Sequence, residues 1–223
     1  MSGALPLVEA RLQWDLGCYR AGRGIGWSLP PASLRNVARR SERTLDRTLG
    51  VPIAPSTCTG RLATVTLNGT LDRAMLIPGF VPGDIYGIAD AVVYGSGKGL
   101  NVARAAMALG LPVRATGLVA GQCGQWICDL LHAERIPECF FHLPGEQSRI
   151  ATIIVDAEHG QTTVINGPGP TVSPSMWPVI RSAIDDAVKD LPWLALSGSV
   201  PLGLPDRAYA ELCHSAQVRG QHV

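Results

Sequence analysis

The stretch Gly95-Ser96-Gly97-Lys98-Gly99-Leu100-Asn101 is the most informative part of this sequence. The run Ala91-Val92-Val93-Tyr94 before it is short and apolar, which is typical of a strand. Residues 101–109 after it have a helical composition, and Gly110 followed by Pro112 marks the end of that helix. The sequence therefore predicts a strand, a glycine-rich loop with a lysine, and a helix that begins near Asn101.

This loop differs from two well-known nucleotide-binding loops. A P-loop needs a glycine where the sequence has Val92, and a serine or threonine after the lysine, where it has Gly99. A dinucleotide-binding fingerprint needs a glycine three residues after Gly97, where Leu100 stands. Two interpretations remain. The helix start can offer its free N–H groups to anionic or hydroxyl oxygens, or the loop is a purely structural strand-to-helix turn.

Strand-like and helix-like segments alternate from Leu62 onward, which predicts a three-layer α/β fold with a mainly parallel sheet. The hairpin predicted across Glu158-His159-Gly160 does not fit the alternation and indicates a small accessory sheet. Residues 221–223 are expected to begin a further strand. The predicted strands are 63–67, 91–94, 113–119, 149–156, 161–166 and 193–196, and the predicted helices are 101–109, 125–133, one capped by Ser173, and 206–218.

The helix after Ser173 is amphipathic, and Pro178 near its beginning is expected to delay its start. The buried apolar run Trp193-Leu194-Ala195-Leu196 is typical of a strand inside a parallel sheet. The side chains predicted to face the core from the two central helices are Ile127, Leu130, Leu131, Trp177, Ile180, Ile184 and Val188.

The composition excludes several classes of function. Apolar residues make up 46% and charged residues 17%, which indicates a globular chain, and a net charge of +1 predicts no nucleic-acid partner and no binding to an anionic membrane. The chain has no apolar run near the ~20 residues of a membrane span, and charged residues interrupt any signal-peptide core. The six cysteines match no common zinc spacing, so we expect a cytoplasmic protein without a metal site.

Residues 1–61 show no sustained helical or strand period in their apolar residues. They are expected to be a poorly ordered N-terminal extension, or translated sequence upstream of the true translation start. A basic helix is predicted at 34–49, with a solvated face rather than a nucleic-acid arm. We assign no function to this segment, and residues 62–223 are predicted to form one domain.

Fragments from Leu62 to Val223 resemble, in order and spacing, the PfkB (ribokinase-like) carbohydrate kinases. The loop and helix start at 95–104 resemble the family's first signature. The resemblance implies a three-layer α/β/α ribokinase-like fold with a small β-lid, nearest to the 1-phosphofructokinase and tagatose-6-phosphate kinase branch. The other fragments that carry it are 64–73, 78–84, 166–170 and 196–201.

The resemblance implies ATP-dependent, Mg²⁺-assisted phosphorylation of a phosphosugar, D-fructose 1-phosphate or tagatose 6-phosphate. In this family a Gly-Ala-Gly-Asp motif supplies the catalytic base, and an Asn-x-x-Glu motif and later loops hold magnesium and ATP. These segments would lie beyond Val223, so the resemblance implies a C-terminally truncated chain without a catalytic residue, an ATP site or metal ligands. The alternative to an enzyme is an inactive fragment that binds a phosphosugar or pairs through its lid.

The resemblance assigns substrate-binding roles to Asp72, Gly97, Lys98, Asn101, Arg149 and Ser199. Asp72, placed at the end of the first strand, would accept hydrogen bonds from sugar hydroxyls, with a turn-capping aspartate as the alternative. Gly97 and Asn101 would line the sugar.

The other three residues would bind the substrate's phosphate. Lys98 would offer a mobile charge, and the alternative is a solvated loop lysine. Arg149 would make a forked contact, and the alternative is an exposed arginine at a strand end. Ser199 would approach the same phosphate from the Ser197-Gly198-Ser199 loop.

Segments 73–94 and 140–166 would correspond to the family's lid, which often pairs between subunits, so a homodimer is expected. Four positions depart from the family pattern, which indicates weaker selection or an altered substrate: Gly69, Ser96, Ala151 and Gly167. If the backbone at Ser96 needs a positive φ, its Cβ costs about 1 kcal/mol.

Overall fold

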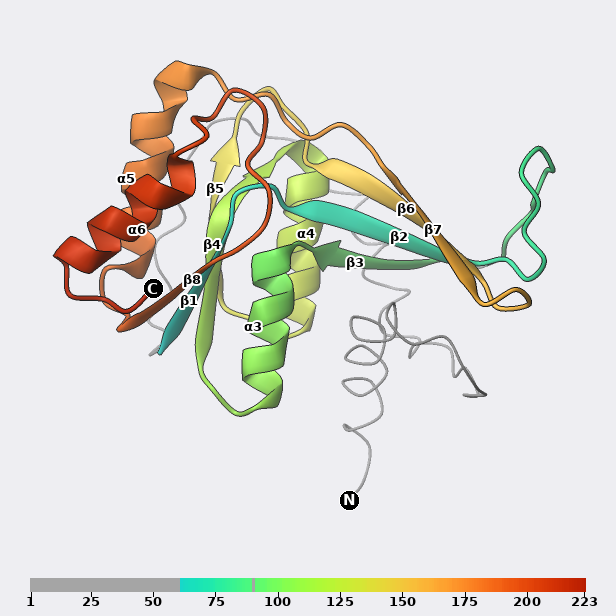
Figure 1. Cartoon of the computed structure of the whole chain (residues 1–223), viewed down its shortest axis with the longest axis horizontal. Coiled ribbons are helices and arrows are strands. Elements are labelled where there is room, and N and C mark those ends of the chain that lie inside the picture. The colour runs from blue at the N-terminus through green and yellow to red at the C-terminus, as the bar shows by residue number, and fades with distance from the viewer. Residues whose placement is uncertain (1–60, 90) are drawn as a thin grey trace. The chain divides into compact units, whose positions relative to one another are not determined.

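The computed structural model describes residues 61–89 and 91–223 (Figure 1). The segment 1–60, with the helix predicted at 34–49, lies outside the described residues. The elements in chain order are β1 (Leu62–Thr66), β2 (Thr70–Leu76), β3 (Val92–Ser96), α3 (Lys98–Ala108), β4 (Val113–Ala120), α4 (Gly121–Ala133), β5 (Glu138–Leu143), β6 (Arg149–Asp156), β7 (Gln161–Asn166), the 3₁₀ turn η2 (Pro174–Met176), α5 (Trp177–Val188), β8 (Trp193–Leu196) and α6 (Ala208–Val218).

The described chain divides into two units. The larger unit holds residues 61–72, 94–151 and 166–223, and the smaller unit holds residues 73–89, 91–93 and 152–165. All six substrate-binding residues predicted from the sequence belong to the larger unit. The two units are therefore described one at a time.

The larger unit is built on a parallel sheet with the strand order β5-β4-β1-β8. Leu62 pairs with Val113 of β4 on one side and with Trp193 of β8 on the other. Helices α5 and α6 cover one face of this sheet, while α3 and α4 pack on the other (Figure 1). This arrangement confirms the predicted three-layer α/β fold.

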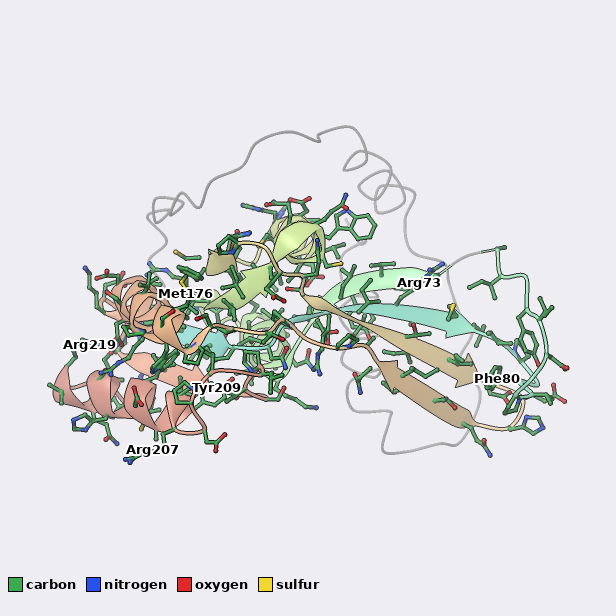
Figure 2. All side chains as sticks on the ribbon, turned by 90° about the horizontal axis from the view of Figure 1, so that it is seen from above. Arg73, Phe80, Met176, Arg207, Tyr209 and Arg219 are labelled. Atoms are coloured by element: carbon green, nitrogen blue, oxygen red, sulfur yellow. The ribbon has the colours of Figure 1, made fainter. Side chains whose placement is uncertain are left out.

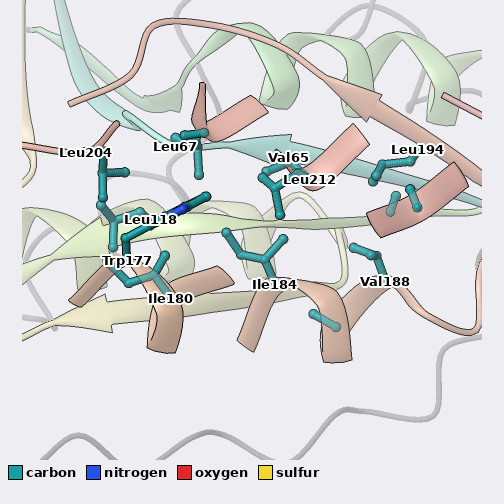
Figure 3. Packing of buried hydrophobic residues seen from close by; sticks show 14 of the residues in the cluster. Val65, Leu67, Leu118, Trp177, Ile180, Ile184, Val188, Leu194, Leu204 and Leu212 are labelled. Atoms are coloured by element: carbon teal, nitrogen blue, oxygen red, sulfur yellow. The ribbon is translucent and has the colours of Figure 1, made fainter. Parts of the chain in front are cut away.

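Strand β1 alternates between the two faces of the sheet. Ala63, Val65 and Leu67 point into a core shared with α5 and α6 (Figure 3). Thr64 and Thr66 are buried on the other face, where Thr66 meets the start of α3. The period of two in the sequence therefore produces one apolar face and one face with hydroxyl groups beneath a helix.

The amphipathic pattern predicted for α5 is confirmed, because Trp177, Ile180, Ile184 and Val188 all lie in this core (Figure 3). The chain first makes the 3₁₀ turn η2, so that Pro178 falls in the first turn of α5. A proline is tolerated there because the first N–H groups of a helix have no partner within the helix. The expected delay of the helix start is therefore confirmed.

Strand β5 corrects the predicted extent of the lid. Residues 140–143 were expected to belong to the lid hairpin, but they form the end of β5, which pairs parallel with β4 from Ala115↔Glu138 onward. The helix α4 carries the chain from β4 to a parallel neighbour, as crossover connections do. The apolar run at 139–141 is thus part of the main sheet.

Strand β8 is only partly buried, which corrects a second expectation. Trp193 is 53% exposed, because β8 is the last named strand on its side of the sheet. Beyond it His222 forms a parallel bridge with Trp193, and the Leu194 N–H donates to the His222 carbonyl at 2.8 Å. The predicted beginning of a further strand at 221–223 is confirmed by this bridge.

A second sheet has the strand order β3-β2-β6-β7, so the predicted hairpin across Glu158-His159-Gly160 and the small accessory sheet are confirmed. In the smaller unit, the carboxylate of Asp156 accepts hydrogen bonds from the backbone N–H groups of Gly79 and Phe80 at 2.9 and 3.1 Å. It also accepts them from Glu158 and His159 in the β6–β7 turn. One buried carboxylate therefore holds the turn and the segment after β2 together.

Candidate functional site

The candidate site lies at the carboxyl ends of β1 and β8, which are adjacent and parallel. Ligands of open α/β sheets bind at this edge, because the loops that follow neighbouring strands meet there. Asn68 follows β1 and Ser199 follows β8, and the Asn68 amide donates to the Ser199 hydroxyl at 3.1 Å. A Cβ placed on Gly198 would contact the Lys98 side chain at 3.6 Å. The predicted phosphate-binding loop and the predicted lysine are thus brought together.

Asp72 lies in the middle of β2, not at the end of the first strand, and it is only 9% exposed. A position inside a strand also excludes the turn-capping alternative. Its Oδ1 atom has no hydrogen-bond partner among the described residues. Burial raises the pKa of Asp72, and this effect is partly offset by hydrogen bonds from Ser96 and Thr70 and by nearby arginine charges. A buried acceptor of this kind is suited to a sugar hydroxyl.

Arg149 is the first residue of β6 and is half-buried, so the alternative of an exposed strand-end arginine is wrong. Its Nε atom lacks a hydrogen-bond partner in the described part of the chain, as does Oδ1 of Asn68. Its positive charge also acts on the Asp72 carboxyl, and its carbonyl accepts a hydrogen bond from the Thr70 hydroxyl at 3.4 Å. Arg149 and Asp72 therefore belong to one site.

Three of the buried polar atoms that have no hydrogen-bond partner among the described residues belong to residues of this site: Asn68 Oδ1, Asp72 Oδ1 and Arg149 Nε. A buried donor or acceptor without a partner costs about 1–3 kcal/mol, and folded proteins contain few of them. Two acceptors and one cationic donor are the groups that would bind hydroxyls and a phosphate. This cluster indicates a ligand site with a polar, partly anionic occupant.

The helix α3 begins at Lys98, three residues earlier than predicted. Lys98 is therefore the first residue of the helix, but its side chain is exposed, so the alternative of a solvated lysine stays open. Asn101 lies in the same first turn, and its side-chain oxygen accepts a hydrogen bond from Arg104 at 3.5 Å. The free N–H groups at the start of a helix favour an anion, which agrees with the phosphate expected here.

The glycines of the loop are needed for packing as well as for ligand approach. Gly97 precedes the helix with a φ of 147°, and a Cβ there would come within 2.7 Å of Thr66 Cγ2. A Cβ on Gly99 would lie 2.8 Å from the Val65 carbonyl oxygen. Both glycines therefore allow α3 to lie close against β1.

The strain expected at Ser96 is absent. Arg135 is the only non-glycine residue with a positive φ among those that the structure describes. Ser96 ends β3 with its side chain buried. The φ of Ser96 is not positive, so the condition under which strain was expected is not met.

Sequence reasoning missed two residues that shape the site. Asn68 had been assigned no role of its own. Tyr209 lies on α6 (Figure 2), and its hydroxyl accepts from the Leu67 N–H at 3.3 Å and donates to the Ser197 carbonyl at 3.0 Å. It thus joins the end of β1 to the loop after β8. The pattern of α6 predicts a helix but not which loops its tyrosine reaches.

Neither magnesium nor ATP can be assigned to this part of the chain. Residues 61–89 and 91–223 contain no group of three or more His, Cys, Asp or Glu side chains that could hold a metal ion. We therefore assign none of these residues to magnesium or to the nucleotide. Over the same residues, every helix is too short or too polar to cross a bilayer.

Comparison with known proteins identifies the class. Residues 80–223 match the family described as pfkB family carbohydrate kinase, and the chain therefore belongs to this family. It is 32% identical over 164 residues to the 1-phosphofructokinase of Rhodobacter capsulatus, which is 73% of this chain and 52% of the relative.

Solved structures agree with this assignment. A possible 1-phosphofructokinase from Thermotoga maritima matches with a TM-score of 0.67 and 31% identity, over 72% of this chain and 51% of the other. Escherichia coli phosphofructokinase-2, solved in complex with substrates and products, matches with a TM-score of 0.65 and 25% identity, over 72% and 52%. The chain spans about half the length of the relatives that it matches.

Proposed function

We propose that residues 61–223 form the phosphosugar-binding part of a kinase similar to 1-phosphofructokinase, with D-fructose 1-phosphate as the sugar. The reaction of such a kinase is the ATP-dependent formation of fructose 1,6-bisphosphate. Support comes from the family membership and from the 1-phosphofructokinase relative. The observation that carries the proposal is the cluster of orphaned polar atoms of Asn68, Asp72 and Arg149.

Each proposed role follows from the chemistry of the side chain. Asp72 accepts hydrogen bonds from sugar hydroxyls, and Gly97 and Asn101 line the sugar. Arg149 and Lys98 bind the substrate's own phosphate, the first through a planar fork and the second as a point charge. Ser199, held by Asn68, adds a hydroxyl on the same side. Binding of this kind orients the acceptor hydroxyl, and orientation is a large part of catalysis in phosphoryl transfer.

For the 223-residue chain itself, we propose phosphosugar binding without turnover. Phosphoryl transfer depends on magnesium and on groups that stabilise the developing charge. The described residues offer no cluster of carboxylates for a metal ion, which favours a binding role for this chain. Production of fructose 1,6-bisphosphate from ATP and fructose 1-phosphate by the purified chain would overturn this part of the proposal.

Isothermal titration calorimetry of the whole chain with fructose 1-phosphate tests the binding site. We expect Arg149→Met and Asp72→Asn to weaken binding by about tenfold or more, because each removes a charge-assisted contact. Two exposed residues provide matched controls, and Arg61→Met and Asp84→Asn should bind like the wild type. Absence of binding by the wild-type chain, or equal affinities of Arg149→Met and the wild type, would contradict the proposal.

The same experiment separates the candidate sugars. Tagatose 6-phosphate and unphosphorylated fructose are titrated alongside fructose 1-phosphate. A site built on Arg149 and Lys98 should lose most of its affinity for fructose, since the phosphate is missing. Tighter binding of tagatose 6-phosphate than of fructose 1-phosphate would reassign the substrate within the family.

The proposal also includes a homodimer formed through the lid. In the smaller unit, exposed apolar side chains occur on three strands, at Leu76, Val92, Val164 and Ile165. Apolar side chains that gather on a surface favour association with a partner. Sedimentation velocity should show a dimer for the wild type and a monomer for Val164→Asp. A monomeric wild type at micromolar concentration would rule the dimer out.

We further propose that the chain works in the cytoplasm. The cysteines in the described part of the chain are free, at positions 123, 128, 139 and 213, which fits a reducing compartment. Fractionation of cells that express a tagged chain tests this, and recovery outside the cytoplasmic fraction would contradict it.

A further inference from the structure

Arg104 lies on α3, and its guanidinium contacts three other residues. Its Nε atom donates to Glu134 Oε2 at 2.7 Å and its Nη2 atom donates to Glu134 Oε1 at 3.2 Å, so the two charged groups meet through both carboxylate oxygens. Nη2 also donates to the Gly95 carbonyl oxygen at 2.5 Å. Nη1 donates to Asn101 Oδ1 at 3.5 Å. Arg104 therefore joins the end of α4 to the glycine loop and to the first turn of α3.

The ion pair between Arg104 and Glu134 is largely buried, since the two side chains are 13% and 11% exposed. A buried arginine needs a counter-charge and hydrogen-bond acceptors, and Glu134 supplies the counter-charge. A buried ion pair adds little net stability compared with apolar side chains of the same size. Stability is therefore a weak reason for this pair, whereas its contacts with the loop are a specific one.

Gly95 is held from two directions. A Cβ placed on it would lie 3.2 Å from the Ile127 carbonyl oxygen and 3.3 Å from Ile127 Cα, so the loop packs closely on the backbone of α4. The Gly95 carbonyl in turn accepts from Arg104. These residues all belong to the larger unit. The backbone at the beginning of the glycine loop is thus fixed by α4 on one side and by Arg104 on the other.

The side chain of Asn101 is oriented by the same arginine. A guanidinium can only donate hydrogen bonds, so it requires the oxygen of the Asn101 amide on its own side and thereby sets the direction of the amide nitrogen. We propose that the pair of Arg104 and Glu134 is a positioning unit of the phosphosugar site, which fixes the Gly95 carbonyl and the Asn101 amide before the ligand binds. The identity of the ligand rests on the proposed function, whereas the fixing of the loop does not.

The first test needs no ligand. An NMR experiment that correlates the Ser96 amide with the preceding carbonyl reports the Gly95 carbonyl carbon in the whole chain. Because a hydrogen bond moves this signal downfield, we expect an upfield shift in Arg104→Met. Arg104→Lys should shift it in the same direction, since a lysine paired with Glu134 has no planar fork to share with the loop. An unchanged Gly95 signal in Arg104→Met would overturn the inference.

The control for this test is Arg181→Met. Arg181 of α5 pairs with Glu211 of α6 at 3.2 Å, so it is also an arginine that joins two helices through a glutamate. It is not among the hydrogen-bond donors to the glycine loop in the described part of the chain, and its removal should leave the Gly95 signal in place. A shift of the Gly95 signal in Arg181→Met as large as that in Arg104→Met would show a general loosening of the fold and would overturn the specific role of Arg104.

The second test separates positioning from stability. In calorimetry with fructose 1-phosphate, Arg104→Lys should bind about tenfold more weakly, although its charge can still pair with Glu134. The double variant Arg104→Met, Glu134→Leu replaces the ion pair by apolar side chains, so urea melts should show a stability close to that of the wild type. Its affinity should nevertheless stay about tenfold reduced, because neither new side chain donates to Gly95 or Asn101. Arg181→Met should bind like the wild type.

A purely structural ion pair gives the opposite result. Wild-type affinity in a folded Arg104→Lys variant, or in the double variant with its stability restored, would overturn the positioning role. A wild-type chain that binds no fructose 1-phosphate would refute the proposed function, and with it the ligand-binding part of this inference. In that case the Gly95 carbonyl signal still decides whether Arg104 fixes the loop.

Discussion

Asn68 donates a hydrogen bond from its side-chain amide to the hydroxyl of Ser199 at 3.1 Å, across 131 positions of sequence. This bond joins the turn after β1 to the loop after β8. The other end of the same amide, Oδ1, is buried and lacks a partner among the described residues. Asn68 therefore holds Ser199, a proposed phosphate-binding residue, in place. Its own Oδ1 atom can still accept a hydrogen bond from a ligand.

Replacing Asn68 by alanine should weaken fructose 1-phosphate binding by about fivefold to tenfold, because Ser199 loses its partner and the site loses an acceptor. Calorimetry measures the affinity, and a urea melt measures stability. Ser199→Ala should show a similar loss, and the double variant should lose less than the sum of the two. Fully additive losses would show that the two side chains act independently.

Tyr209→Phe should lower the free energy of unfolding by about 1–2 kcal/mol, because the Leu67 N–H and the Ser197 carbonyl lose a common partner. Urea denaturation followed by far-UV circular dichroism provides the measurement. Tyr86→Phe is the matched control, since its hydroxyl bonds at an exposed position and should matter little. Equal unfolding midpoints for Tyr209→Phe and the wild type would show that the bridge contributes nothing.

Gly99→Ala should destabilise the chain by about 1–3 kcal/mol, although alanine favours helices over glycine. The added Cβ would meet the Val65 carbonyl oxygen at 2.8 Å, and a backbone atom inside a parallel sheet cannot move away cheaply. Thermal denaturation provides the comparison with Gly87→Ala, where a Cβ would meet no atom of the described residues within 4 Å. A Gly99→Ala variant as stable as Gly87→Ala would contradict the close packing of α3 on β1.

The contact between His159 Nδ1 and Asp156 Oδ2, at 2.6 Å, should be sensitive to pH. Burial alone would raise the pKa of Asp156, but hydrogen bonds from His159 and from Gly79 outweigh it and lower the pKa to about 2. The Asp156 hydrogen bond, then the Asp156 and Glu158 charges, raise the pKa of His159.

The directions of the two pKa shifts define the pH range in which this contact stabilises the fold. The contribution of Asp156 is complete above its usual value near 3.8 and is lost as the pH falls through about 2. The contribution of His159 is complete below its usual value of 6.5 and is lost as the pH rises through its higher folded value. In an NMR titration of the histidine signals, Asp156→Asn should lower the pKa of His159 towards 6.5 and leave the other histidines unchanged. A His159 pKa that does not respond would show that the contact is absent in solution.

Much of the fold could be predicted because the sequence patterns that indicate its strands and helices lie within short segments. The strands β6 and β7 and the core face of α5 follow from periods of two and about 3.6 residues, and they occur where expected. The lid boundary was wrong because 139–141 is an apolar run that fits either sheet, and only pairing with β4 places it. The exposure of Trp193 was missed for a similar reason, since a sequence does not state which strand lies at an edge.

The departures from the family pattern also needed the structure. Gly167 is one of the four departures, and a Cβ there would lie 2.8 Å from the Ile150 carbonyl oxygen, so close packing against β6 explains the glycine. Strain at Ser96 was expected only if its backbone needed a positive φ, and its φ is not positive. Dihedral angles and close approaches between strands are not encoded in any short window of residues.

The sequence alone determined the alternation of strands and helices and the loop at 95–101, because these are properties of short segments in which composition and spacing decide local structure. The six residues assigned to substrate binding come from the family resemblance and stay a prediction. Tertiary structure alone decided that Asn68 meets Ser199 and that Tyr209 bridges two loops. Such contacts join residues far apart in the chain, and they exist only because parallel pairing places the ends of β1 and β8 side by side.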